Sequence, residues 1–430
     1  MLRRLIIGLI IIVLLAACRG GRKTATPTGT QIPTQKATTQ PEATLIPSAT
    51  STAVPATSTL TPVPTTQTVT PLGGNKEIQK ATPTLVPTAT AIVLGPENFP
   101  TNVDPLTGLV VADPTLLERR PVAVKVNIVP RTSTRPPWGL SFADIVYDYY
   151  HNDGYTRFHA IFYGQDAELV GPIRSGRLLD SDLIRMYQSI FAYGSADALI
   201  NQRFFNAEYA YRLILEGATV NCPPTAAIPL CRFDPSGQDH LLGSTAALSQ
   251  FATARKMDNV RQNLNGMSFN SAAPANGAAG SQMSVRYSGD NYARWDYNAA
   301  SGTYLRFQDD VYDQGQGESY APLIDKLNNQ QISAANVIFI LVPHVYFAPP
   351  PAEIIEILLS GTGKAYAFRD GQMYEVKWNR PGNNSVLYLT FADGTRYTFK
   401  PGNTWVQVIT DTSLVTPKDN GVWRFDFRFP

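Results

Sequence analysis

Seven polar residues stand out in the central part of the chain because they occur in segments that are otherwise apolar and strand-like. Arginine and aspartate are rarely fully buried in such segments unless they are paired. Arginine also binds carboxylate and phosphate groups through two parallel hydrogen bonds. Two interpretations stay open: an internal ion-pair network, which the sequence slightly favours, and a pocket for an anionic ligand. The residues are Arg135, Asp144, Thr156, Arg157, Arg174, Ser175 and Arg177.

Three of these residues lie in the segment Gly171-Pro-Ile-Arg-Ser-Gly-Arg177, which predicts a tight turn between a strand and a helix. Ser175 is expected as the N-cap of this helix, and two aspartates follow in its first turns. A helix start presents unpaired N–H groups and a positive dipole end, which can hold a carboxylate or phosphate. We therefore expect an anion-receiving loop here, completed by Arg157. The competing interpretation is that the chain's own acids neutralise these arginines: Asp144, Asp180 or Asp182.

The sequence lacks the common catalytic signatures. It has no Gly-x-Ser-x-Gly elbow, Ser-x-x-Lys, His-Glu-x-x-His, P-loop or Gly-x-Gly-x-x-Gly. Pairs such as Asp180/Asp182 and Asp309/Asp310 are more often solvated or helix-start acids than glycosidase pairs. The four histidines are scattered and no spacing fits a zinc site, so we expect no metal and no cofactor. These absences favour a noncatalytic binding or scaffold protein, with an envelope hydrolase acting on glycan or peptide as the alternative.

The N-terminus indicates export and a lipid anchor. Arg3 and Arg4 precede an apolar run, Leu5 to Leu15, that is shorter than the ~20 residues needed to span a bilayer. Leu15-Ala-Ala-Cys18 resembles the lipobox of bacterial lipoproteins, in which the cysteine thiol is acylated. We expect residues 1–18 to form the signal peptide with its lipobox cysteine, and the body to lie outside the cytoplasm on the cell membrane. An uncleaved membrane anchor is the less favoured alternative.

The remaining cysteines and the charge limit the partners. Cys222 and Cys231 are one leftover pair in an exported chain, which predicts a disulfide. The loop between them is short, so the bridge should fasten a local excursion rather than the core. Beyond position 100 there are 28 basic and 31 acidic residues, whereas a nucleic-acid binder normally carries a basic domain. The expected partners are therefore the membrane, through the lipid, and a cell-wall polymer or an envelope protein, but not nucleic acid.

Composition divides the chain into a stalk and a body. No Phe, Tyr or Trp occurs before Phe99, and about half of the residues in 24–91 are Thr, Pro or Ser. Such a segment buries too little apolar surface to fold, and its Thr-Pro steps favour an extended chain. Whether sugars are attached to it stays open. We predict a disordered stalk over 19–98, an N-terminal α/β domain over 99–265, a linker over 266–283 and a β-rich C-terminal domain over 284–430.

Hydrophobic periodicity gives the expected elements of the body. In the first domain it predicts strands over 121–129, 144–150 and 156–163, and helices over 177–190, 202–216 and 244–255, the last capped by Ser244. In the second it predicts strands over 284–287, 304–307, 337–342, 353–359 and 405–409, and hairpins over 365–378 and 386–399 with Asp-Gly at their tips. The fold class is α+β: a mixed α/β N-terminal lobe followed by a β-rich, hairpin-based C-terminal lobe.

Short stretches between residues 101 and 410 form a recognisable pattern: Asp104-Pro-Leu-Thr-Gly108, Arg120-Pro-Val-Ala-Val124 with Asn127, Arg135-Pro-Pro-Trp-Gly-Leu-Ser-Phe-Ala-Asp-Ile-Val-Tyr147, Gly154-Tyr-Thr-Arg157, Gly171-Pro-Ile-Arg-Ser-Gly-Arg177, Trp295-Asp-Tyr, Tyr304-Leu-Arg306, Asn336-Val-Ile, Gly361-Thr-Gly-Lys-Ala, Asp370-Gly, Trp378 and Gly402-Asn-Thr-Trp405. They resemble the YerB-like family of bacterial lipoproteins. That resemblance implies paired N- and C-terminal domains and gives no activity. The sequence departs from the family at His240-Leu-Leu-Gly-Ser244, where a His-Asn-Leu-Tyr-like run is usual, and in the insert between Cys222 and Cys231.

Overall fold

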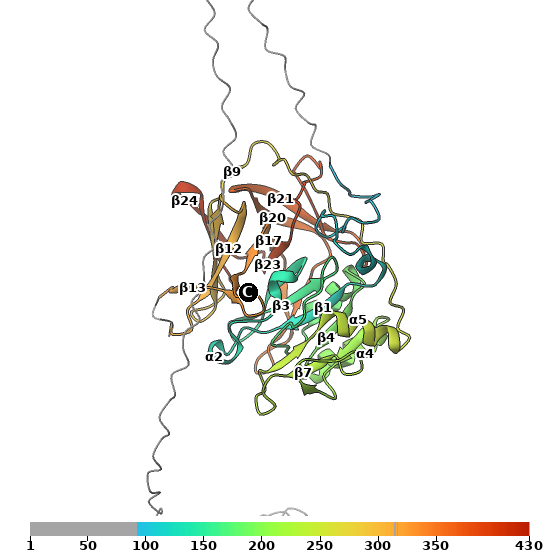
Figure 1. The fold of residues 1–430 in the computed structure, drawn as a ribbon. Helices are drawn as coiled ribbons and strands as arrows, with labels where there is room; N and C mark the ends of the chain where they lie inside the picture. The colour runs from blue at the N-terminus through green and yellow to red at the C-terminus, as the bar shows by residue number, and fades with distance from the viewer. Residues whose placement is uncertain (1–92, 314, 316, 430) are drawn as a thin grey trace, which may run out of the picture. The chain divides into compact units, whose positions relative to one another are not determined.

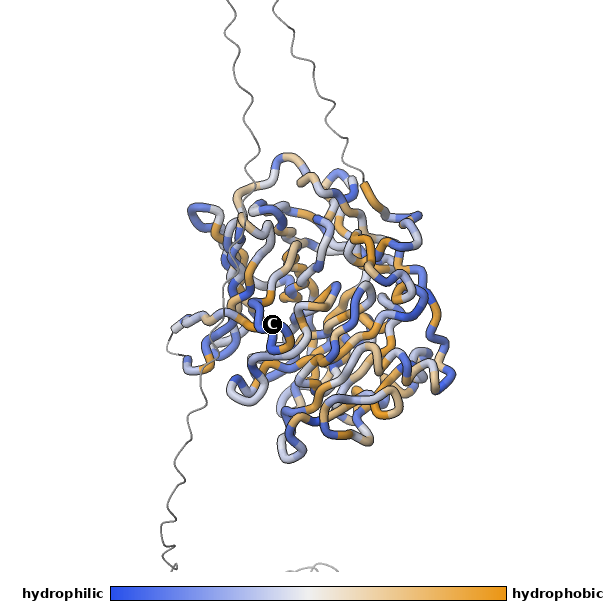
Figure 2. Tube along the Cα trace, in the orientation of Figure 1, coloured by the Kyte–Doolittle hydropathy of each residue, from blue (hydrophilic) through white to orange (hydrophobic). Residues whose placement is uncertain are grey.

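The computed structural model describes residues 93–429 except Gln314 and Gln316. The predicted signal peptide with Cys18, and nearly all of the predicted stalk, lie outside the described residues. Within the described part, no helix is long and apolar enough to cross a membrane. The polar residues are concentrated in the connecting loops, whereas the central strands are largely apolar (Figure 2).

The largest sheet has eleven strands, in the order β22–β21–β20–β17–β23–β2–β3–β1–β4–β5, with β9 paired to β21 (Figure 1). β1 runs parallel to β4, and β4 parallel to β5, while β2 and β3 form an antiparallel hairpin. The strands are β1 (Val122–Val126), β2 (Ile145–Asn152), β3 (Tyr155–Phe162), β4 (Ile190–Tyr193), β5 (Leu213–Leu215), β9 (Ala278–Ala279), β17 (Asn336–Leu341), β20 (Gly361–Arg369), β21 (Gln372–Arg380), β22 (Tyr388–Thr390) and β23 (Thr404–Ile409).

A second sheet of seven strands has the order β13–β12–β11–β10–β25–β24, with β16 paired to β12. Its strands are β10 (Gln282–Arg286), β11 (Tyr292–Asn298), β12 (Thr303–Asp309), β13 (Tyr320–Pro322), β16 (Ser333–Ala334), β24 (Leu414–Lys418) and β25 (Val422–Asp426). Three small sheets complete the strands: β6 (Val220–Asn221), β7 (Leu230–Arg232) and β8 (Leu241–Gly243); β14 (Ile324–Asp325) and β15 (Gln330–Gln331); β18 (His344–Ala348) and β19 (Ile354–Ile357).

The described helices are few and short: α2 (Arg131–Thr134), α3 (Leu178–Met186), α4 (Ala198–Phe205) and α5 (Thr245–Ala254), with 3₁₀ turns at Pro114–Glu118, Leu140–Phe142, Ala210–Arg212 and Asp419–Gly421. The mixed first part and the β-rich second part confirm the predicted α+β class. The side chain of Ser244 caps α5, as predicted.

One predicted helix, over 202–216, is wrong in most of its length. α4 ends at Phe205, and after a 3₁₀ turn the chain enters β5, which pairs with β4 as a further parallel strand. The apolar residues of β5 fit a strand as well as a helix, and a run this short cannot be assigned by periodicity alone.

The predicted linker over 266–283 does not separate two sheets. β2 pairs directly with β23 in parallel, so the large sheet takes strands from both sides of that segment. Met267, Ser268 and Phe269 inside the segment are buried, and Phe269 forms backbone hydrogen bonds with Leu94. The prediction of two separately packed lobes is corrected in this respect: the polar, Gly- and Ala-rich composition of the segment describes only its loops.

A buried ion pair joins the two large sheets. Arg306 on β12 donates to the carboxylate of Asp148 on β2 at 2.9 Å, and neither side chain is more than 1% exposed. The guanidinium also lies against the rings of Phe158, Trp295 and Trp405, at 5.2, 5.1 and 4.5 Å from the ring centroids. Such contacts are strongest when the cation is desolvated. The pair therefore connects strands contributed by both halves of the chain.

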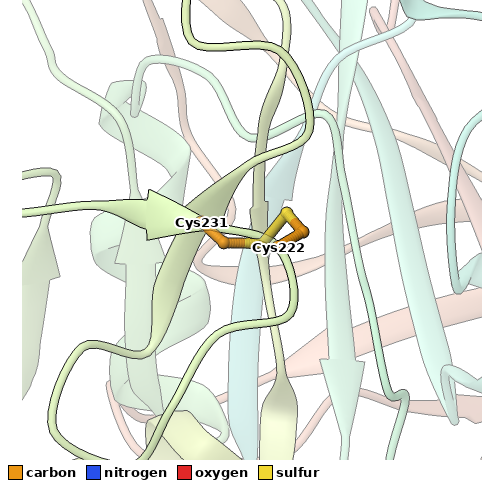
Figure 3. Close-up of a disulfide and its surroundings, with 2 residues drawn as sticks. All are labelled: Cys222 and Cys231. Carbon is orange, nitrogen blue, oxygen red and sulfur yellow. A yellow bond between two sulfur atoms is a disulfide. The ribbon is translucent and has the colours of Figure 1, made fainter.

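The disulfide Cys222–Cys231 is present and closes a loop between β6 and β7, with Cα atoms 4.9 Å apart (Figure 3). It fastens a local excursion that leaves the large sheet after β5 and returns through β8, instead of joining parts of the core. Arg232 on β7 forms an ion pair with Glu216, the residue after β5, and adds a second tie to the same excursion.

We expect Arg306→Met to lower the free energy of unfolding by about 3–5 kcal/mol, because it leaves the Asp148 carboxylate buried without its partner. Adding Asp148→Leu should recover part of that loss, since the buried charge is then gone. Urea denaturation of the purified protein measures both effects. Arg294→Met is the matched control: its ion pair with Asp296 is partly exposed and should contribute less than about 1 kcal/mol. Equal losses for Arg294 and Arg306 would contradict the importance of the buried pair.

Candidate functional site

The candidate site lies at the carboxyl edge of the parallel strands β1 and β4. The segment 171–177 runs along this edge, because the N–H of Arg174 donates to the carbonyl of Lys125 and the N–H of Gly194 donates to the carbonyl of Arg174. The antiparallel strand β3 begins at the same edge, since Val126 at the end of β1 is opposite Phe158. Open α/β sheets bind ligands at this edge of their parallel strands.

Four of the seven predicted residues meet here, and we call them the arginine site: Arg157, Arg174, Ser175 and Arg177. Arg157 donates to the side-chain oxygen of Asn127 at 3.3 Å and to the carbonyl of Ser175 at 3.0 Å. The hydroxyl of Ser175 lies 2.9 Å from that of Ser195, which follows β4. Arg174 forms an ion pair with Asp239.

Arg157 and Arg177 differ from the other arginines around them. Among the described residues neither guanidinium forms an ion pair, and the Nε atom of Arg177 is buried with no hydrogen-bond partner. Burial, together with repulsion from Arg177 and Arg174, lowers the pKa of Arg157 to about 9. Burial also lowers the pKa of Arg177. Positive charge is thus concentrated at partly buried side chains, an arrangement that an anion would stabilise.

The floor of the arginine site is a fully buried hydrogen-bonded network around Asp180. Its carboxylate accepts from Lys125 at 3.3 Å, His159 at 2.8 Å and the hydroxyl of Tyr149. Burial alone raises the pKa of Asp180, but Lys125 and His159 hold it below its usual range. Burial lowers the pKa of Lys125 to about 7 despite the attraction of Asp180.

The same carboxylate also occupies the start of α3. Its second oxygen accepts the N–H of Arg177, the N-cap residue, at 2.6 Å. The prediction of Ser175 as N-cap is therefore wrong, because the chain remains extended for two more residues. Anion binding at this edge has to come from the arginine side chains, since the chain's own acid has taken the N-cap N–H.

His151 is a further member that lies beside the arginines. It is on β2, two residues after Tyr149, and both side chains line a small closed cavity of about 10 Å³ together with Arg177. Burial and the nearby Arg157, Arg177 and Lys125 lower the pKa of His151 well below its usual value. The histidine is therefore a neutral hydrogen-bonding group beside two cations.

The structure keeps the other three predicted residues away from the arginine site. Arg135 forms an ion pair with Asp309 at 2.9 Å. Thr156 accepts from the side chain of Asn291 at 3.2 Å, on the face of β3 that is turned toward the second sheet. Asp144 accepts from the N–H of Gly164 at 3.1 Å, just beyond the opposite end of β3.

Sequence reasoning missed Lys125, Tyr149, His151 and His159. Each lies in a strand whose other residues are mainly apolar. The signal that could have found them is the period of two in β2 and β3. It puts residues 149 and 151, and residues 157 and 159, on one face of the sheet.

A second polar feature is a buried carboxyl pair, Asp104 with Asp144, beside a cavity of about 560 Å³. Burial raises the pKa of Asp104 to about 6. Burial and the charge of Asp104 raise the pKa of Asp144 well above its usual value. Both shifts favour the state in which the two carboxyls hold a proton between them, as carboxyls in hydrogen-bond contact do.

We expect this pair to make the protein less stable as pH rises from about 4 through about 6. The raised pKa values mean that the folded state holds a proton that the unfolded chain releases, so the pair's contribution is present at low pH and lost above the folded pKa. Asp144→Asn should keep a hydrogen bond to Asp104 without needing the extra proton. It should therefore raise the midpoint temperature of unfolding at pH 7. Thermal unfolding between pH 4 and 8 checks this, with exposed Asp411→Asn as control. An unchanged pH profile in Asp144→Asn would refute the shared proton.

Comparison with known proteins assigns two ranges of the chain to one family. Residues 106–219 match the N-terminal domain of a protein of unknown function, DUF3048, and residues 283–406 match its C-terminal domain. The chain is 28% identical over 326 residues to "Putative lipoprotein YerB" of Bacillus subtilis (strain 168), covering 74% of this chain and 89% of that protein. The crystal structure of YerB protein from Bacillus subtilis matches with a TM-score of 0.57 at 24% identity, over 71% of this chain and 96% of that chain. The latter likeness concerns the fold.

Proposed function

Since the chain belongs to the YerB-like family of paired DUF3048 domains, whose function is described as unknown, we propose that it is a lipid-anchored envelope protein that binds an anionic polymer at the arginine site. The anchor in this proposal is Cys18. The curated relative is itself named a lipoprotein, and the lipobox-like sequence ahead of the stalk agrees with that name.

One observation supports the binding site above all others. Arg157 and Arg177 are partly buried, lie close enough to repel one another, and their guanidinium groups have no carboxylate partner among the described residues. An uncompensated buried charge is costly to a fold. A bound anion would offset that cost. If the two arginines belonged to an internal network, carboxylates of the chain itself would already offset it.

The chemistry of the site favours phosphate or carboxylate groups. Guanidinium presents two parallel N–H donors that match the oxygens of either group. Ser175, Ser195 and His151 add neutral hydrogen-bonding groups near the two cations. Polymers of the bacterial envelope carry such anions at regular intervals, and a protein held outside the membrane meets them directly.

The carboxyl pair gives less support to a hydrolase. Asp104 and Asp144 are in hydrogen-bond contact, whereas the two carboxyls of glycosidases are about 5–9.5 Å apart. An aspartic-protease dyad does have carboxyls in contact, and Asp104 and Asp144 also line a cavity, but a dyad must present its oxygens to the substrate. Here Asp104 is 0% exposed, and its oxygens accept from Leu106 and Thr107 in its own turn. The pair thus has the features of a structural contact that holds the turn containing Asp104 against the sheet.

We expect Arg157→Gln and Arg177→Gln to reduce binding of polyglycerol phosphate at least about tenfold each, the effect of one charge-assisted hydrogen bond. Their melting temperatures should fall little or rise, because each change removes an unpaired buried charge. Isothermal titration and thermal unfolding of the purified protein measure the two effects. Arg255→Gln, on the exposed surface, changes net charge equally and is the control. Strong destabilisation with unchanged binding would assign the arginines to an internal network instead.

We expect Cys18→Ala to release the protein from the membrane fraction or block its processing. The lipid is attached through the cysteine thiol, which alanine lacks, and the described residues contain no membrane-crossing helix. Cell fractionation and intact mass measurement decide the outcome. Cys222→Ala is the control, since it removes a cysteine that belongs to the disulfide and not to the lipobox-like sequence. Unchanged retention and mass in Cys18→Ala would exclude the anchor.

A further inference from the structure

We propose that Asp239 is a specificity-determining residue of the arginine site, which it tunes toward groups with one negative charge, such as a phosphodiester, and away from phosphomonoesters and pyrophosphate. The inference rests on the proposed function. Asp239 is not a ligand-binding group in this proposal; it acts by pairing with Arg174 and so removing one positive charge from the site.

The position of Asp239 is set by a backbone contact of the nearby residue Leu241 and by a side-chain hydrogen bond. The N–H of Ile173, next to Arg174, donates to the carbonyl of Leu241, two residues after Asp239, at 2.7 Å. This register brings the Asp239 carboxylate against the Arg174 guanidinium, with side chains 14% and 27% exposed. The second carboxylate oxygen accepts from the hydroxyl of Ser133 at 2.7 Å. Asp239 is therefore held at both oxygens and directed at Arg174.

Asp239 belongs to a part of the chain that the family models do not match. Arg174 lies within the matched segment 106–219, whereas Asp239 lies between this segment and 283–406. The excursion that carries it is closed by the disulfide Cys222–Cys231 (Figure 3). An ion pair of Arg232 with Glu216 ties it as well. Arg174 thus lies in the domain that the family model matches. Asp239, which neutralises it, lies in the disulfide-closed segment outside that domain.

The pairing of Asp239 with Arg174 changes how many positive charges of the site remain for a ligand. Asp180 neutralises Lys125, and Asp239 neutralises Arg174, which leaves Arg157 and Arg177 for a ligand. Asp153 and Asp197 act on Arg177 from a greater distance, without forming an ion pair with it. A phosphodiester carries one negative charge, whereas a phosphomonoester carries about 1.5–2 at pH 7. Freeing Arg174 would supply the additional cation that the more highly charged group needs.

The test compares Asp239→Asn with the unchanged protein, using polyglycerol phosphate and inorganic pyrophosphate as probes in isothermal titration at one salt concentration. The expected result is about tenfold tighter binding of pyrophosphate, with a smaller gain, about threefold, for polyglycerol phosphate. Asp234→Asn is the matched control, because it lies in the same excursion and makes no contact with Arg174. Equal gains for both probes, or an equal gain in the control, would overturn the inference.

A second pair of variants keeps the test decisive if Asp239→Asn folds poorly. Arg174→Gln leaves Asp239 unpaired beside the site and should weaken pyrophosphate binding about tenfold. The double variant Arg174→Gln/Asp239→Asn should return pyrophosphate affinity to that of the unchanged protein. Unchanged affinity in Arg174→Gln would refute the role of Asp239. Failure of the unchanged protein to bind either probe would instead refute the proposed function itself, so the two failures are distinguishable.

Discussion

The buried ion pair of Arg306 with Asp148 is the constraint on which the rest of the fold depends. It forms where the two large sheets meet, and it has to form because either charge alone would be costly in that environment. Three aromatic rings from β3, β11 and β23 surround the guanidinium, so strands from both halves of the chain are brought together at one point. Several residues of the family pattern, Trp295, Arg306 and Trp405, therefore serve this contact rather than a ligand.

The same pair determines which side chains can reach the arginine site. Neighbouring residues of a strand point to opposite faces, so directing Asp148 toward the second sheet directs Tyr149 toward α3. Tyr149 there completes the network around Asp180, and His151, two residues on, lies beside Arg157 and Arg177. A shift of β2 by one residue would exchange the two faces and destroy both features together. The register of β2 thus determines both the ion pair between the two sheets and the side chains that lie at the arginine site.

Most strands of the large sheet could be predicted from alternation and turn signals, but β4, β5 and β9 were not, and residues 202–216 were expected to be helical where the chain forms β5. The parallel pairing of β2 with β23 could not be predicted, since no local pattern specifies a partner more than 250 residues away; two lobes were expected instead. The sequence could predict that Arg157 lies near residues 171–177, because the two are close together in the chain. The pairing of Arg174 with Asp239 depends on the excursion returning through β8, which only the tertiary structure shows.

The distinction that matters for function is between arginines that the chain neutralises itself and arginines that it does not. The guanidinium groups of Arg135, Arg174 and Arg306 each pair with an aspartate, whereas those of Arg157 and Arg177 pair with none among the described residues. The most direct measurement is a crystal structure of the protein grown with selenate, an anion that anomalous scattering locates without ambiguity. The account predicts a selenium peak within hydrogen-bond distance of the Arg157 and Arg177 guanidinium groups. Peaks only at exposed lysines elsewhere, or a carboxylate of the chain occupying that position, would contradict it.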